Sequence, residues 1–180
     1  MIEIVRGNLL DAKEKYLAHQ CNCITKKAAH LSFDVFKRFP YADIYVGRSN
    51  VDQPGTIVVK GDGNSQRYVI NMLGQYYPGS PKYPNSTLDG STIREKYFYQ
   101  CLLEIYKIKD LESIAFPYRV GCGAAGGKWN NYLGNLENFS KYRDDAIVKL
   151  YCLTEDDLKI AKDEYQSLLV RMLKKDLDIK

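Results

Sequence analysis

The sequence Phe116-Pro-Tyr-Arg-Val-Gly-Cys-Gly-Ala-Ala-Gly-Gly-Lys-Trp129 contains four glycines, at positions 121, 123, 126 and 127, within seven residues. An apolar segment that predicts a strand, Ser113–Phe116, precedes it, and Trp129–Lys141 can form a helix after it. A glycine-rich turn between a strand and a helix lets the backbone approach a ligand and aims unpaired amides at it. The N-terminus of the following helix adds partial positive charge, so the pattern predicts an anion site, most often for phosphate or diphosphate.

The glycine spacing matches neither of two common nucleotide-binding fingerprints. The loop comes late in the chain, outside a first strand–helix–strand unit, which argues against the G-x-G-x-x-G dinucleotide pattern. Trp129 follows Lys128 where the G-x-x-x-x-G-K-[ST] phosphate-binding loop requires Ser or Thr. Alternatively, the loop only turns the chain and binds no ligand. The glycine spacing does not distinguish these two interpretations, so evidence from other segments is needed.

The composition is that of an ordinary globular domain. With 180 residues, 45% hydrophobic and 27% charged, the chain fits one compact domain over residues 1–180. It has no run of about 18 apolar residues and no basic leader before an apolar stretch, so we expect no membrane association and an intracellular, cytoplasmic or nuclear, protein. The net charge of +4 is too weak to argue for nucleic acid and suits a small anionic ligand.

Five cysteines, at positions 21, 23, 101, 122 and 152, follow no disulfide framework spacing, so we expect free thiols. The histidines His19 and His30 lie near Cys21 in sequence, but their spacing matches no zinc pattern. We therefore expect no metal and no cofactor, and no Cys–His catalytic pair is predicted. Cys21 and Cys152 should lie inside core strands, where free cysteine is common.

Apolar runs rich in β-forming residues alternate with helical segments along the chain. The six expected strands are Ile2–Val5, Tyr16–Cys21, Thr56–Lys60, Tyr68–Leu73, Ser113–Phe116 and Ile147–Leu153. Since few tight hairpins connect them, the order predicts an α/β layered domain with a largely parallel sheet. Two polar loops interrupt this order, Arg48–Gly55 and Gln75–Gly90. The second contains three prolines and three tyrosines, which either form the lip of a ligand pocket or anchor the loop.

Two helices have strong end signals. In the first, Thr92-x-x-Glu95 forms a capping box, and an apolar stripe follows at Ile93, Tyr97, Cys101, Ile105 and Ile108. In the second, Thr154 caps an acidic first turn, and an apolar stripe continues to the lysines at positions 174 and 175. Weaker patterns predict helices over His30–Arg38 and Trp129–Lys141.

Together with the glycine loop, three further segments resemble the macrodomain family, whose fold binds ADP-ribose. They are Val5-Arg-Gly-Asn-Leu9, Leu17-Ala-His-Gln-Cys-Asn-Cys23 and Tyr68-Val-Ile-Asn-Met72. The similarity is greatest to the branch with the yeast ADP-ribose-1''-phosphate phosphatase and the terminal ADP-ribose protein glycohydrolase. The resemblance covers a core of residues 1–153 and implies a mixed sheet sandwiched between helices, with residues 154–175 as an extra or extended C-terminal helix.

The resemblance also implies ligand-binding positions. Asn8 stands where most macrodomains carry an Asp that accepts from the adenine amino group, with Leu9 supplying a backbone amide. Asn22 matches the asparagine that bonds the distal ribose; alternatively it only satisfies backbone groups at a strand end. The second diphosphate loop corresponds to Gly121, Cys122, Gly123, Ala124 and Ala125.

Two departures from the family pattern concern the first diphosphate loop and the catalytic residues. Where this branch reads like Ala-Lys-Gly-Leu-Ala, the chain has Ala28-Ala-His-Leu-Ser32, with His30 in place of glycine and Leu31 beside it. His30 either crowds the loop and changes the backbone path, or bonds a phosphate or acts as acid or base. The glycohydrolase's Lys and Asp correspond to Met72 and Ala125, which can neither form a covalent sugar intermediate nor move a proton.

We therefore expect a macrodomain that reads or processes an ADP-ribose derivative, either ADP-ribose-1''-phosphate or a mono-ADP-ribosylated target on protein or nucleic acid. If the chain is a hydrolase, a phosphatase is the better expectation. The reacting group would then be a water held near Asn22 by the distal ribose and phosphate, and His30 or His19 would be the base. The alternative is a nucleic-acid or protein interaction module that kept the fold and lost the pocket.

Overall fold

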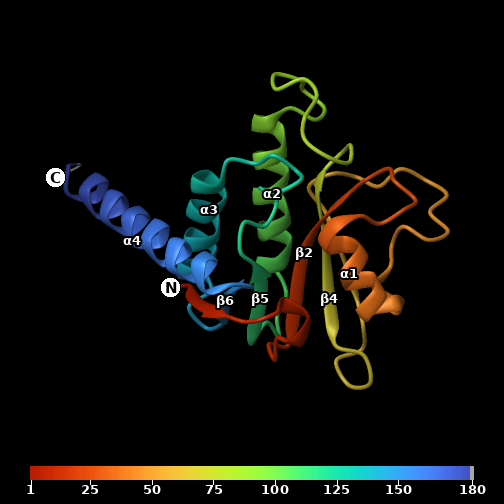
Figure 1. Ribbon diagram of the computed structural model, residues 1–180, viewed down its shortest axis with the longest axis horizontal. Coiled ribbons are helices and arrows are strands. Elements are labelled where there is room, and N and C mark those ends of the chain that lie inside the picture. The colour runs from red at the N-terminus through yellow and green to blue at the C-terminus, as the bar shows by residue number, and fades with distance from the viewer. Residues whose placement is uncertain (179–180) are drawn as a thin grey trace.

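The computed structural model describes residues 1–178 and shows one sheet between two layers of helices and loops (Figure 1). The sheet has six strands in the order β1-β6-β5-β2-β4-β3. All pairings are parallel except that of β3 with β4. The prediction of an α/β fold with a mixed, largely parallel sheet is therefore confirmed.

The predicted helices and strands all occur, with ends that differ by up to three residues. The strands are β1 (Glu3–Arg6), β2 (Tyr16–Asn22), β3 (Ile57–Lys60), β4 (Tyr68–Gln75), β5 (Ser113–Pro117) and β6 (Ile147–Cys152). The α-helices are α1 (His30–Arg38), α2 (Ser91–Tyr106), α3 (Trp129–Tyr142) and α4 (Glu155–Asp178). Two short 3-10 helices, η1 (Leu9–Asp11) and η2 (Pro40–Ala42), were not predicted.

Each face of the sheet has its own apolar core. On one face, α2, α3 and α4 contribute Phe98, Tyr132 and Leu168 to a cluster with the strands. On the other face, α1 and the two 3-10 helices pack Phe36 and Leu9 against the sheet. The central strands β2, β4 and β5 are buried on both sides, which accounts for their largely apolar sequences. This arrangement leaves the carboxyl ends of β2, β4 and β5 free to support a site.

The predicted capping box of α2 is wrong. The N-cap is Gly90, no side chain caps the helix, and Thr92 lies exposed in the first turn. The preceding turn supplies the acceptors instead, since the Ser91 amide donates to the Pro84 carbonyl at 3.0 Å. A Cβ at Gly90 would lie 2.4 Å from that same carbonyl, so only glycine permits this close approach. Glu95, the other half of the predicted box, accepts a hydrogen bond from an α3 asparagine.

The start of α4 is as predicted. The Asp157 amide donates to the Thr154 hydroxyl oxygen at 3.0 Å, which is the expected cap. The outer part of this helix extends away from the rest of the protein (Figure 1). Within residues 1–178, no helix combines the length and hydropathy that crossing a bilayer requires.

All five cysteines are free thiols, as predicted. Cys21 and Cys152 are buried in the core strands β2 and β6, which confirms their predicted positions.

Candidate functional site

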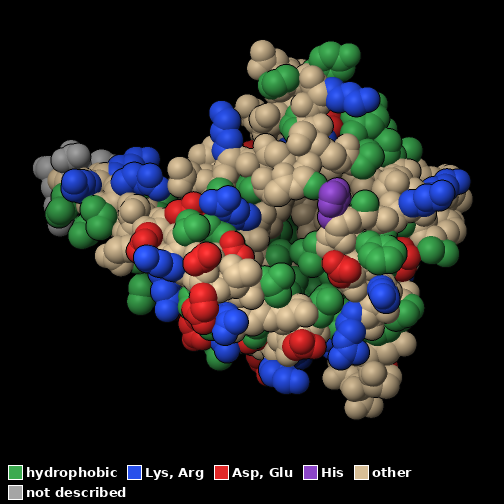
Figure 2. Space-filling view, in the orientation of Figure 1, with side chains coloured by type: hydrophobic (Ala, Val, Ile, Leu, Met, Phe, Trp, Pro, Cys, Tyr) green, Lys and Arg blue, Asp and Glu red, His purple; other side chains and the backbone are tan. Residues whose placement is uncertain are grey.

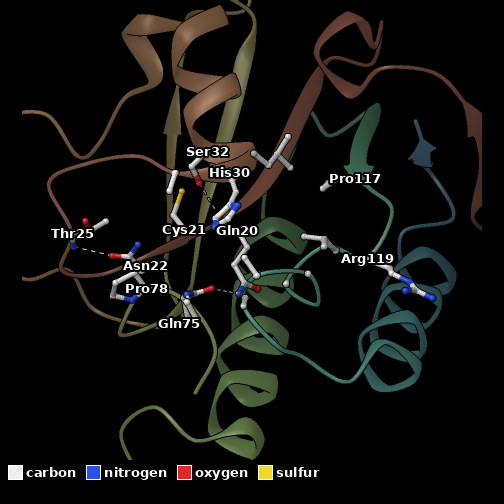
Figure 3. Close-up of a pocket in the computed structure, with 18 of the residues that line it drawn as sticks. Gln20, Cys21, Asn22, Thr25, His30, Ser32, Gln75, Pro78, Pro117 and Arg119 are labelled. Carbon is white, nitrogen blue, oxygen red and sulfur yellow. Dashed lines mark hydrogen bonds between the residues drawn. The ribbon is translucent and has the colours of Figure 1, made fainter. Parts of the chain in front are cut away.

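A pocket of about 430 Å³ opens at the carboxyl ends of β2, β4 and β5 (Figure 3). The residues that begin α1 form one of its walls, and the glycine loop after β5 forms another. Figure 2 shows the hollow on the face of the molecule that Figure 1 presents. Ligands of open α/β sheets bind at this edge of the sheet, where connections diverge from the strand ends.

The N-terminus of α1 gives the first wall its unpaired amides. Its N-cap, Ala29, makes no side-chain cap bond. Within residues 1–178, the amides of His30, Leu31 and Ser32 donate to no other group. Orphan amides at a helix N-terminus, together with the helix dipole, favour an anion.

His30, at the position where the resemblance implies a glycine, has a backbone conformation that favours glycine. Its φ is 51°, which is the left-handed region. Histidine tolerates this region better than most residues, at a cost of roughly 1–2 kcal/mol. The loop therefore keeps a glycine-like backbone and gains an exposed imidazole at the pocket wall.

The glycine loop provides the second wall and is held by its own turns. The Cys122 amide donates to the Arg119 carbonyl at 2.9 Å, and the Gly127 amide donates to the Gly121 carbonyl at 3.0 Å. The amides of residues 123–125 donate to no group among the residues that the structure describes. All three residues line the pocket, so their amides are available to an anion.

Several residues implied by the resemblance lie outside the pocket walls. Cys122 packs partly against the core, and burial raises the pKa of its thiol to about 12. Its amide is used by the turn, so it does not face the pocket as expected. Asn8 caps η1 by accepting from the Leu10 amide at 3.0 Å, and Leu9 is buried in the core. Neither Asn8 nor Leu9 lines this pocket.

Asn22 satisfies backbone groups at the end of β2 and also lines the pocket. Its Oδ1 accepts from the amides of Ile24 and Thr25, at 3.2 and 2.8 Å, so it stabilises the end of β2. Its Nδ2 donates to the Tyr45 hydroxyl at 3.1 Å. Asn22 also lines the pocket, and one of its two amide hydrogens has no acceptor among the described residues.

Tyr45 and Arg48 support Asn22, and sequence analysis missed both. The Arg48 guanidinium donates to the Asn22 and Thr25 carbonyls and lies 4.6 Å from the centroid of the Tyr45 ring. Both residues belong to loops with no local pattern, so only their spatial proximity to Asn22 identifies them.

His19 is excluded as the base, because it does not line the pocket. Its ring is fully buried, with Nε2 2.8 Å from Asn71 Oδ1. Burial lowers its pKa to about 4, so it is neutral at physiological pH. His30 is therefore the imidazole that remains at the pocket wall.

The charged side chains that line the pocket are basic. Lys27 and Arg119 line it, and its described lining includes no Asp or Glu. Arg119 also reaches α4, where its Nη2 lies 3.1 Å from a Glu164 carboxylate oxygen. Met72 and Ala125 stand where the resemblance places the glycohydrolase's Lys and Asp. Neither can act as a nucleophile or transfer a proton, because Met72 is in the core and Ala125 has only a methyl group.

The loop after β4 completes the pocket on a further side. Gln20 donates to Gln75 at 2.8 Å across the pocket floor, and Gln75 in turn donates to the Tyr77 carbonyl (Figure 3). Pro78 and Gly79 line the pocket, whereas the tyrosines of the loop do not. Of the three tyrosines, Tyr76 packs against the core and anchors the loop, whereas Tyr77 and Tyr83 are exposed.

These features define a three-layer α/β protein with a pocket, partly lined by unpaired backbone amides, at the carboxyl ends of the strands. Comparison with solved structures identifies the fold as that of macrodomains. The macrodomain of Mycobacterium tuberculosis DarG gives a TM-score of 0.67 at 21% identity, covering 86% of this chain and 99% of its own. The macrodomain of Thermus aquaticus DarG gives a TM-score of 0.64 at 24% identity, covering 84% of this chain and 98% of its own. A mutant Oceanobacillus iheyensis macrodomain with ADPR gives a TM-score of 0.67 at 17% identity, covering 96% of this chain and 94% of its own.

The predicted macrodomain fold is confirmed by these structures. No protein-family model matches the sequence, and no curated protein matches it. The branch named in the resemblance stays a prediction.

Proposed function

We propose that this chain binds ADP-ribose or a close derivative in the pocket between α1 and the glycine loop. The observation that carries the proposal is the pair of unpaired amide groups, at residues 30–32 and 123–125, that line one pocket. A diphosphate has oxygens on two phosphorus atoms and can accept from both groups at once. The similarity to a macrodomain solved with ADPR supports the same ligand class.

The electrostatics favour the same ligand. Two cations, Lys27 and Arg119, line the pocket, and no carboxylate is among its described lining residues. Phosphate oxygens would therefore meet amide donors and positive charge without a repelling group. We assign the diphosphate to the two loops and the distal ribose to the remaining amide hydrogen of Asn22. Asn8 and Leu9 stay as proposed adenine contacts outside the pocket walls.

A calorimetric titration with ADP-ribose, AMP and ADP-ribose-1''-phosphate tests this function. We expect ADP-ribose to bind much more tightly than AMP, because AMP lacks the second phosphate and the distal ribose. Binding should weaken only modestly with salt, since one diphosphate is held largely by neutral amides. Absence of heat with ADP-ribose would refute the proposal, and a steep salt dependence with polynucleotides would favour the interaction module.

Hydrolysis of ADP-ribose-1''-phosphate is a second candidate function, favoured by His30. Its imidazole is exposed at the pocket wall, next to the amides proposed to hold phosphate. It can take a proton from a water whose oxygen attacks the terminal phosphorus, while the bond between phosphorus and the ribose C1'' oxygen breaks and that oxygen takes up a proton, releasing phosphate and ADP-ribose. Phosphate release that disappears in His30→Ala would support this role. Tight binding with no release from either this substrate or a mono-ADP-ribosylated protein would leave a reader of ADP-ribose.

A further inference from the structure

Arg94 is a buried cation beside the pocket that does not line it. Its side chain is 1% exposed on α2. Nη1 donates to the carbonyls of Gly79 and Ala125, at 2.5 and 2.9 Å, and Nη2 donates to the Tyr77 carbonyl at 3.2 Å. Nε and Nη2 also bind the two carboxylate oxygens of Asp89. All five N–H groups of the guanidinium therefore have acceptors.

The carbonyls bound by Arg94 belong to two different walls of the pocket. Gly79 lies in the loop after β4 and Ala125 in the glycine loop, and both residues line the pocket. Ser80 makes a second link by donating to the Ala124 carbonyl at 3.2 Å. Asp89 extends the network, since it also accepts from the Tyr76 amide at 2.8 Å. One ion pair thus holds loops that are distant in sequence.

We propose that Arg94 is a positioning residue that sets the geometry of both walls and, through it, the affinity for a diphosphate. The proposal rests on the proposed function above. The Ala125 carbonyl is fixed by the guanidinium, so the adjoining amides at 123–125 are held in a defined orientation before any ligand arrives. Preorganised donors bind more tightly, because less ordering is left to occur on binding.

The chemistry of this position requires arginine. The loop carbonyls have no strand partners, and buried carbonyls need donors. A guanidinium presents five donors in a plane and reaches several carbonyls at once, whereas the three donors of an ammonium share one nitrogen. Asp89 neutralises the charge, so Arg94→Lys alters the geometry of the walls while the net charge is unchanged.

A titration with ADP-ribose on the full chain tests the proposal, with Arg94→Lys compared against Arg143→Lys. Arg143 is also buried, and its guanidinium binds the carbonyls of Tyr106, Ile108 and Leu111, far from the pocket residues in the fold. It is therefore a control for general loss of stability. We expect Arg94→Lys to raise the Kd for ADP-ribose by about tenfold or more, because weakening one or two amide hydrogen bonds to a charged phosphate is enough for a tenfold change. Arg143→Lys should leave the Kd nearly unchanged.

Two further measurements separate positioning from folding and from ligand identity. Arg94→Ala leaves a guanidinium-sized space, so millimolar methylguanidinium should restore binding in that variant, whereas Arg143→Ala should bind ADP-ribose equally well with and without the additive. Amide hydrogen exchange without ligand should quicken at residues 76–90 and 121–127 in Arg94→Lys alone. If wild-type protein fails to bind ADP-ribose, the proposed function fails, and the exchange result still tests the positioning.

Three outcomes would overturn the inference. Wild-type affinity in a folded Arg94→Lys protein would show that the walls hold their geometry without the guanidinium. An equal loss in Arg143→Lys would assign the effect to stability alone. Unchanged exchange in both segments would show that Arg94 does not hold the loops.

Discussion

Gly123 is the residue at which a side chain can enter the pocket with least disturbance to the fold. A Cβ added there meets nothing within 4 Å. At Gly121 the same atom would meet the Gln20 side chain at 2.4 Å, and at Gly127 it would meet a backbone carbonyl at 2.5 Å. A side chain at position 123 can therefore affect ligand binding without disturbing the fold. Side chains at positions 121 and 127 of the same loop would clash with the protein itself.

We predict that Gly123→Glu abolishes ADP-ribose binding while the melting temperature stays close to that of the wild type. The carboxylate would occupy the phosphate space and repel it, and each lost bond to a charged group is worth about 1.5–3 kcal/mol. Calorimetry and thermal unfolding measure the two effects separately. Gly123→Ala is the matched control and should retain most of the affinity. Tight binding by Gly123→Glu would mean that the ligand lies elsewhere.

His30 has a backbone role and a side-chain role, which two substitutions can separate. His30→Gly removes the left-handed strain, whereas His30→Ala keeps it without the imidazole. We expect His30→Gly to be more stable than His30→Ala by about 1 kcal/mol, as measured by urea unfolding. Both variants should bind ADP-ribose, and both should lose any phosphatase activity. Equal stability of the two variants would contradict the assigned backbone role.

At the scale of elements, the apolar periodicity predicted every strand and α-helix, because burial on one or both faces leaves a strong pattern. The start of α2 was misplaced for a physical reason. Its first amides are satisfied by a turn that passes close to Gly90, which has no signature in the helix itself. The buried face of α2 also differs from the expected stripe. It carries Arg94 and Phe98, while Ile93 and Tyr97 are only half-buried.

The pairing of β2 with β4 includes a buried polar contact that makes stability depend on pH. His19 of β2 bonds Asn71 of β4, whose Nδ2 donates to the carbonyls of Ala42 and Val58. Burial lowers the pKa of His19 to about 4, below the 6.5 of an exposed histidine. The unfolded chain therefore takes up the proton first, and stability falls as the pH drops from about 6.5 toward 4.

We predict a loss of about 3 kcal/mol in the free energy of unfolding across this range, at about 1.4 kcal/mol for each pKa unit. Urea unfolding between pH 7 and about 5 measures the upper part of the loss. Carboxyl groups with lowered pKa values, such as that of Asp110, contribute only at lower pH. His19→Gln should flatten the dependence. An unchanged slope in that variant would assign it to other groups.

At the scale of the whole molecule, the sequence located the pocket through the glycine loop and the residues that begin α1. It did not reveal Arg94, Tyr45 or Arg48, because the pocket residues to which their side chains hydrogen-bond lie 15 or more residues away in sequence and leave no local pattern. A lone arginine within an apolar helix face is ambiguous until the carbonyls around it are known. The walls of the site were therefore predictable, while the residues that hold the walls in place were not.

The hydroxyl of half-buried Tyr165 connects α4 to the rest of the protein. The Tyr165 hydroxyl accepts from the Ile2 amide at 3.0 Å and donates at 2.6 Å to Glu137 of α3, whose side chain is fully buried. We predict that Tyr165→Phe lowers the free energy of unfolding by about 1–3 kcal/mol, because it leaves a buried acceptor unsatisfied. Urea denaturation measures the change. Tyr142→Phe is the control, since that ring is 78% exposed, and equal midpoints for both variants would contradict the prediction.

The outer part of α4 offers a point of attachment for laboratory use. It extends away from the rest of the protein (Figure 1) and contributes no residue to the pocket lining. Leu173, which lies on it, is 61% exposed. Four of the five native thiols are buried, so a thiol-reactive linker should couple mainly to the new site in Leu173→Cys. A helix is a stiff rod that rises about 1.5 Å per residue, so it acts as a built-in spacer. The protein can thus be tethered to a sensor chip while the mouth of its pocket stays open to analyte.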